Sequence, residues 1–143
     1  MSKTTESISP KDALEDVGKP TLVLGASLNP RRTSFTAIHH LREAGHKVYA
    51  LGGRNGTVAD IEILKARTDE PLPALPMPDL HTITLYLNAR RQESYYDYIL
   101  SLSPQRIIFN PGAENRQLFD LATAKGIQCL EACTLVMLNF GRF

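Results

Sequence analysis

Short apolar runs alternate along this chain with longer amphipathic stretches. Residues 22–24 form an unbroken apolar run, which is typical of a strand buried on both faces of a parallel sheet. Further strands are predicted at residues 46–51, 61–64, 81–87, 106–109 and 127–130. The 81–87 segment alternates apolar and polar residues with a period of two, while the 106–109 segment is a short buried run.

Helices are predicted between these strands, over residues 34–44, 88–102, 116–125 and 133–138. Thr33 and Ser34 are suitable N-caps for the first helix, Gly45 suits its end, and Asn88 can cap the second. The apolar stripes are predicted to face the core, and they comprise Tyr95, Tyr98, Ile99 and Leu102 in the second helix and Leu118, Leu121 and Ala122 in the third.

The alternation of strands and helices predicts βαβ units and an α/β fold. We expect a doubly wound, mainly parallel sheet of five to six strands with helices on both faces. Four prolines between residues 71 and 78 predict an irregular connection, with one helical turn near Ala74. Residues 1–18 are predicted to be a flexible tail, and residues 19–143 a single domain.

Small and polar residues follow the predicted strands, at the edge of the sheet where ligands bind in such folds. They are Gly25, Ala26, Ser27, Arg31 and Arg32 after the first strand, Gly52, Gly53 and Arg54 after the second, Asn88 and Arg90 after the fourth, and Asn110, Pro111, Gly112 and Glu114 after the fifth. A strand, a loop of small residues and a helix N-terminus together favour a phosphate-bearing ligand. The same residues also suit an ordinary tight turn with solvated arginines.

The dinucleotide fingerprint is incomplete in this sequence. It requires Gly-x-Gly-x-x-Gly after the first strand and an acidic residue near the end of the second. Only Gly25 is present, and Leu51-Gly52-Gly53-Arg54 contains no acid. Arg54 could instead accept a phosphate on the ribose, as in sites for NADP, and a Walker loop is absent.

Composition excludes several classes of partner. The net charge is +1, which argues against nucleic acid, and no apolar run reaches the roughly 20 residues that span a membrane. The N-terminus lacks a signal pattern, and the two cysteines, Cys129 and Cys133, are interpreted as reduced thiols of a cytoplasmic protein. The sequence leaves open whether the protein forms a homodimer.

Several motifs together resemble the small, single-domain CoA-binding proteins, which are related to the CoA-binding domain of succinyl-CoA synthetase. The resemblance covers about residues 20–138. The motifs are Gly25-Ala26-Ser27 with Pro30, Arg32 and Ser34, then Tyr86-Leu87-Asn88, Asn110-Pro111-Gly112 and Glu131-Ala132-Cys133-Thr134. The resemblance implies a Rossmann-like domain that binds coenzyme A.

The resemblance also implies where each part of coenzyme A would lie. The pyrophosphate would lie over residues 25–27 and the helix start at Ser34, paired with Arg32. Residues 52–54 would hold the adenosine end, with Arg54 on the 3′-phosphate, while Leu87, Asn88 and residues 110–112 would line the remainder. The chain departs from the family at one point, since Leu51-Gly52-Gly53-Arg54 stands where many members have a Val-Asn-Pro-Lys-like turn.

No complete catalytic constellation is evident. Ser27 has no recognisable His–acid pair and suits a hydroxyl donor to phosphate. Cys133 suits a small buried residue, although a thiol there could form a mixed disulfide with CoA. No metal-binding set is found. We therefore predict a non-catalytic module that binds CoA or acyl-CoA as a small-molecule ligand. The alternatives are an NADP- or nucleotide-binding oxidoreductase-like enzyme, and a small acyl-CoA enzyme using Cys133 or Ser27.

Overall fold

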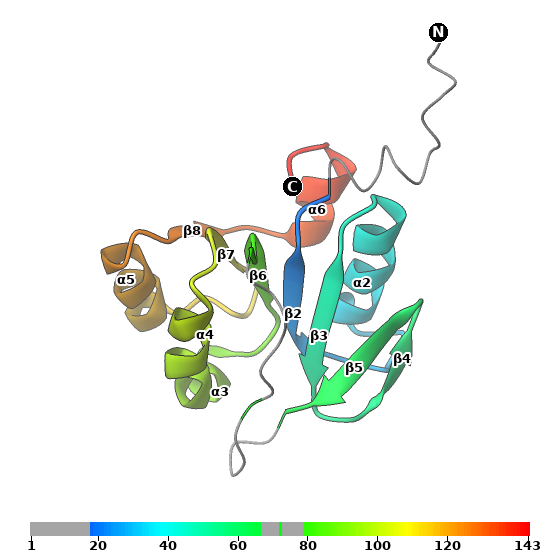
Figure 1. The fold of residues 1–143 in the computed structure, drawn as a ribbon, viewed down its shortest axis with the longest axis horizontal. Helices are drawn as coiled ribbons and strands as arrows, with labels where there is room; N and C mark the ends of the chain where they lie inside the picture. Colours follow the sequence, from blue (N-terminus) through cyan, green and yellow to red (C-terminus); the bar gives the residue numbers. More distant parts are fainter. Residues whose placement is uncertain (1–17, 67–71, 73–78) are drawn as a thin grey trace, which may run out of the picture.

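A seven-stranded sheet forms the centre of the computed structural model (Figure 1), which describes residues 18–66, 72 and 79–143. Six strands are mutually parallel: β2 (Thr21–Ala26), β3 (Val48–Gly52), β5 (Ile61–Lys65), β6 (Thr82–Leu85), β7 (Arg106–Phe109) and β8 (Gln128–Glu131). Residues 1–17 of the tail predicted over residues 1–18, and the helical turn predicted near Ala74, lie outside the described residues.

The strand order places the start of the chain at the centre of the sheet. The order is β4-β5-β3-β2-β6-β7-β8, so β2 pairs with β3 on one side and with β6 on the other. The chain builds outward from β2 in one direction and then, beginning at β6, in the other. The boundary between β2 and β6 is therefore the switch point, where ligands bind in open α/β sheets.

Helices cover both faces of this sheet (Figure 1), which confirms the predicted α/β class. On one face lie α2 (Thr33–Glu43) and α6 (Thr134–Asn139), and on the other α3 (Ala89–Gln92), α4 (Tyr96–Leu102) and α5 (Arg116–Ala124). Alternation along β2 supplies both cores, because Val23 packs with Ile38 on the α2 face while Leu22 and Leu24 pack with Ile99 on the other.

The sheet has one strand more than expected. Strand β4 (Gly56–Val58) pairs antiparallel with β5 at the edge of the sheet. Its sequence, Gly56-Thr57-Val58, is too short to show a period and follows a glycine-rich turn, so only its pairing with β5 defines it as a strand.

The helix expected over residues 88–102 is interrupted. A 3-10 turn at Glu93–Tyr95 separates α3 from α4. The side chain of Gln92, just before this turn, is completely buried and bonds two loop carbonyls. Gln92 precedes Tyr95 by three residues and so lies on the same side of the helix as the predicted stripe, where it is buried. The helical segments on either side of the 3-10 turn are short.

Two details of helix ends and faces were also wrong. Arg32, rather than Thr33 or Ser34, is the N-cap of α2, and its side chain makes no cap hydrogen bond. Leu121 of α5 is 41% exposed, because α5 covers only the outer strands and a narrow stripe of it meets the sheet. Gly45 does end α2, with φ +87 and an N–H bonded to the Arg42 carbonyl at 3.0 Å.

Candidate functional site

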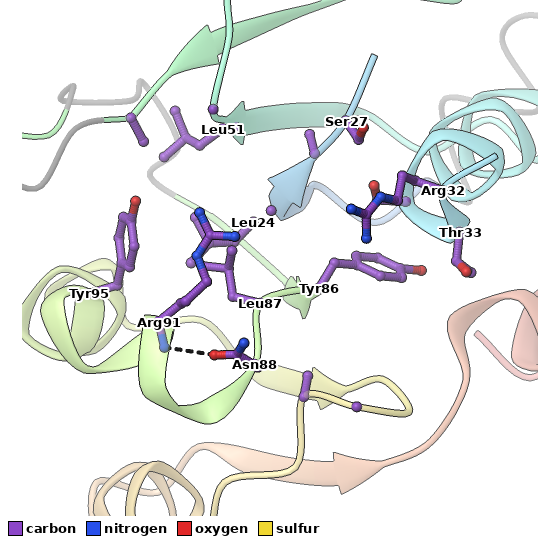
Figure 2. A pocket seen from close by; sticks show the side chains of 18 of the residues that line it. Leu24, Ser27, Arg32, Thr33, Leu51, Tyr86, Leu87, Asn88, Arg91 and Tyr95 are labelled. Atoms are coloured by element: carbon purple, nitrogen blue, oxygen red, sulfur yellow. Dashed lines mark hydrogen bonds between the residues drawn. The ribbon is translucent and has the colours of Figure 1, made fainter. Parts of the chain in front are cut away.

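A pocket of about 510 Å³ lies at the carboxyl ends of β2, β3, β6 and β7, across the switch point. Figure 2 shows side chains from both halves of the sheet surrounding it. The lining residues are Leu24, Gly25, Ala26, Ser27, Arg32, Thr33, Ser34, Leu51, Gly52, Gly53, Ala66, Tyr86, Leu87, Asn88, Arg91, Tyr95, Pro111, Gly112 and Ala113.

The loop after β2 is held in shape by its own backbone. Gly25 has φ +98, and a Cβ there would lie 3.0 Å from the carbonyl carbon of Tyr86. Asn29 then stabilises the turn through two hydrogen bonds of 3.0 Å. Its side-chain oxygen accepts one from the Arg31 N–H, and its backbone carbonyl accepts the other from the Arg32 N–H. The chain therefore enters α2 with Arg32 beside the pocket.

The start of α2 gives the pocket its electrostatic character. The first turn of a helix has N–H groups without intrahelical partners, and Thr33 and Ser34 of this turn both line the pocket. Arg32 is exposed, and its guanidinium points into the pocket in Figure 2. Among the described residues that line the pocket there is no Asp or Glu, so the site suits an anion.

A second wall is built from the segment after β6. Asn88 caps α3, with its side-chain oxygen accepting from Arg91 N–H at 2.9 Å. Arg91 and Tyr95 follow four residues apart, and both line the pocket. In Figure 2 they stand on the opposite side of the pocket from Arg32.

Most of the residues that the resemblance assigns to CoA lie together at this pocket, and three of them do not line it; neither do Arg31, Arg90 and Glu114, which were expected at the same edge. Pro30 is exposed in the loop before α2, and Arg54 is exposed in the turn after β3. Asn110 is 3% exposed and directs its side chain into the core. There its Nδ2 donates to Thr84 Oγ1 at 2.7 Å and to the Leu85 carbonyl at 2.9 Å.

Eight of the lining residues were not assigned to the ligand from the sequence: Leu24, Thr33, Leu51, Ala66, Tyr86, Arg91, Tyr95 and Ala113. Leu24 and Leu51 were assigned to strand cores and Tyr95 to a core-facing stripe, and each contacts both core and pocket. A usable signal existed for Arg91, because the Asn88 cap fixes the first turn of α3 and so the direction of its third residue.

Tyr86 forms part of the pocket wall with its phenol kept neutral. Burial raises the pKa of Tyr86 to about 12, so the hydroxyl carries its proton at any physiological pH. The hydroxyl lies near the bonded Thr84 and Thr134 hydroxyls, yet it makes no hydrogen bond of acceptable geometry within the described part of the chain. Tyr86 therefore does not act as a base, and its hydroxyl is buried rather than exposed to the pocket.

The residues considered for catalysis are dispersed. Ser27 Oγ accepts a hydrogen bond from Asn29 N–H at 3.0 Å, within its own loop. Cys133 occupies the N-cap position of α6 and does not line the pocket. His46 and His81 lie just before β3 and β6, at the opposite edge of the sheet, where burial is the main cause that lowers the pKa of each.

In the described ranges, no group of three or more His, Cys, Asp or Glu side chains is placed to hold a metal ion. Within those ranges, too, no helix has the length and apolar character needed to cross a membrane.

Six parallel strands in this order, with the pocket at the switch point, define a Rossmann-like α/β domain. The profile of a protein family described as a CoA binding domain matches residues 19–139, and the chain therefore belongs to this family of CoA-binding domains. No curated protein matches the chain in sequence.

Solved structures have the same fold over nearly the whole chain. A crystal structure of an uncharacterized protein is 39% identical, with a TM-score of 0.78, and the match covers 89% of this chain and 99% of that one. A hypothetical protein from Pyrococcus horikoshii OT3 is 16% identical, with a TM-score of 0.71 and 98% of both chains covered. A Thermus thermophilus protein is 19% identical, with a TM-score of 0.73 and coverage of 92% and 95%.

Proposed function

We propose that this chain binds coenzyme A, free or as an acyl-CoA, in the switch-point pocket, and that it performs no chemistry of its own. One observation carries the proposal: a helix N-terminus and two guanidinium groups border the pocket, with no carboxylate among its described lining residues. Membership of a CoA-binding family makes CoA the anion of choice.

In this proposal the pyrophosphate lies over residues 25–27. Because Gly25 and Ala26 carry little or no side chain, the anion can approach the backbone closely. The N–H groups of Thr33 and Ser34 and the guanidinium of Arg32 then supply donors and positive charge. The pantetheine arm extends past Asn88 toward Pro111 and Gly112, at the end of β7.

The non-catalytic part of the proposal rests on the lining. Among the described residues around the pocket there is no His, Cys, Asp or Glu, so Ser27 has no general base beside it. Cys133 is outside the lining.

A cytoplasmic location stays a prediction from the sequence, and both cysteines are free thiols.

Calorimetric titration of the full chain with CoA and, separately, with NADP tests the ligand. We expect binding of CoA that weakens by about tenfold or more in Arg32→Ala, as expected when a hydrogen-bonded ion pair with phosphate is lost. Arg31→Ala is the matched control, because Arg31 is the neighbouring exposed arginine and does not line the pocket. Absence of CoA binding, with NADP bound instead, would refute the ligand assignment.

Incubation with acetyl-CoA and chromatography of the products tests the second part. We expect the thioester to survive as long as it does in buffer alone. Turnover that is lost in Cys133→Ala or Ser27→Ala would overturn the non-catalytic proposal and assign a small acyl-CoA enzyme.

A further inference from the structure

Arg91 gives the pocket a second cation, on the wall opposite Arg32. It is exposed, and its guanidinium points into the pocket from α3 in Figure 2. The Asn88 cap fixes the backbone from which it extends, through the 2.9 Å bond to Arg91 N–H. Within the described part of the chain, its side chain makes no hydrogen bond or ion pair, so the charge is available to a ligand.

The neighbours of Arg91 identify the kind of group it meets. Tyr95 lies one helical turn further on and is 8% exposed. Leu51 and Ala66 also line the pocket and belong to the same apolar cluster as Tyr95. These three side chains give the lining an apolar part that suits a flat aromatic base. A charged arginine beside such a part suits a phosphate on the sugar that carries the base.

The order of these groups across the pocket matches the order of groups in coenzyme A. In the view of Figure 2, Arg91 lies between Tyr95 and Arg32. In CoA, the ribose with its 3′-phosphate lies between the adenine and the pyrophosphate. If Arg32 and the start of α2 take the pyrophosphate, and Tyr95 borders the adenine, Arg91 faces the ribose between them.

We infer that Arg91 recognises the 3′-phosphate and is the residue by which the pocket distinguishes CoA from dephospho-CoA. This inference rests on the proposed function. It reassigns a role that the sequence had given to Arg54, which lies in the exposed turn between β3 and β4 and does not line the pocket. Arg91 is thus a specificity-determining residue, while Arg32 serves both ligands alike.

The test compares two ligands on matched variants of the full chain. CoA and dephospho-CoA are titrated into the unmodified protein, Arg91→Ala, Arg91→Lys, Arg54→Ala and Arg90→Ala. Arg90 is the matched control, since it is the adjacent exposed arginine on α3 and does not line the pocket. Thermal unfolding of each variant establishes that it is folded before the titrations are compared.

We expect the unmodified protein to prefer CoA over dephospho-CoA by about tenfold or more, as a charge-assisted contact to phosphate implies. Arg91→Ala should reduce that ratio to near one, while Arg91→Lys retains part of it and Arg90→Ala and Arg54→Ala retain all of it. In the unmodified protein, the affinity for CoA should also fall more steeply with increasing salt concentration than the affinity for dephospho-CoA. In Arg91→Ala, the two affinities should depend on salt to the same extent.

Three outcomes would overturn the inference. If Arg91→Ala loses affinity for both ligands equally, Arg91 does not recognise the 3′-phosphate. If the preference for CoA over dephospho-CoA disappears in Arg54→Ala, the 3′-phosphate is recognised by Arg54 in the β3–β4 turn. Equal binding of both ligands by the unmodified protein would mean that the 3′-phosphate is not recognised. These results leave CoA binding intact, whereas failure of the unmodified protein to bind either ligand would refute the proposed function itself.

Discussion

Asn115 Nδ2 donates a hydrogen bond of 2.9 Å to Oε1 of Gln92, and this contact joins the two loops that form one wall of the pocket. Gln92 Nε2 in turn donates to the carbonyls of Leu87 and Ala113, each at 2.7 Å. Leu87 follows β6 and Ala113 follows β7, and both line the pocket. Gln92 is completely buried and satisfied, so it fixes the separation of the two loops.

Replacing Gln92 by Leu should therefore lower both stability and CoA affinity. The substitution leaves two loop carbonyls without their donor and removes one of the two acceptors of Asn115 Nδ2, which keeps its bond to Tyr96 OH. We expect a loss of about 2–3 kcal/mol in the free energy of unfolding. Urea denaturation measures this loss. Gln117→Leu, at an exposed position of α5, is the matched control and should change stability by less than about 0.5 kcal/mol. Equal stability of the two variants would contradict the bridging role.

Asn110 should matter for stability through its interior contacts. Its side-chain oxygen accepts from Thr134 N–H at 2.8 Å, while Nδ2 donates to Thr84 Oγ1 and to the Leu85 carbonyl. Asn110→Asp replaces that donor with an oxygen facing a carbonyl, and we expect a cost of about 2 kcal/mol, measured by urea unfolding.

Asn55→Asp is the control for this variant. The Asn55 side chain accepts from Lys65 N–H at 2.9 Å, a role that a carboxylate retains, and it is exposed. We expect little change there. A stable Asn110→Asp protein that loses only CoA affinity would instead return Asn110 to the role of a ligand contact.

Gly52 and Gly53 are adjacent and should respond very differently to alanine. A Cβ on Gly52 would lie 2.2 Å from the carbonyl oxygen of Ala26, where β2 and β3 pair, whereas a Cβ on Gly53 meets nothing within 4 Å. We expect Gly52→Ala to lose about 2–3 kcal/mol or to fail to fold. Gly53→Ala should unfold at nearly the same urea concentration as the unmodified protein. Similar midpoints for the two variants would contradict the close approach of the strands.

Stability should fall on acidification from about pH 7 to pH 5 because of His46 and His81. Burial, followed by the charges of Lys19 and Arg106, lowers the pKa of His46, and burial followed by Arg106 lowers that of His81. The unfolded chain, with histidine pKa values of about 6.5, then binds more protons than the folded one in this range. The contribution of the two histidines to stability is therefore fully present above the histidine pKa of the unfolded chain, and it is lost as the pH falls below that value toward the lower pKa of the folded chain.

The position of His46 gives this prediction a specific variant. Its Nδ1 accepts from Lys19 N–H at 2.9 Å, which requires an unprotonated nitrogen. His46→Gln keeps an acceptor and removes the titration, so thermal unfolding should depend less on pH between 7 and 5. An unchanged pH profile in His46→Gln would exclude His46 as a source.

The sequence by itself determined the alternation of strands and helices, apart from β4 and the break between α3 and α4, and the edge of the sheet at which the pocket lies. Apolar runs such as residues 22–24 and 107–109, bounded by turn residues, are typical of buried parallel strands, and parallel strands bring their carboxyl ends to one edge. Two helix caps were also predicted correctly from the sequence, namely Asn88 at the start of α3 and Gly45 at the end of α2. These features depend on neighbours within a few residues.

The tertiary structure alone decided which polar side chains face the pocket. Asn110 turns inward because Thr84 and Thr134, each more than twenty residues away in sequence, offer it partners, while Arg54 remains in an exposed turn. Arg91 reaches the pocket from α3, which ends at Gln92, and Tyr95 reaches it from the 3-10 turn that follows. Between them, the buried Gln92 amide bonds two loop carbonyls. A loop side chain follows the hydrogen bonds open to it, and distant segments supply those bonds only once the chain has folded.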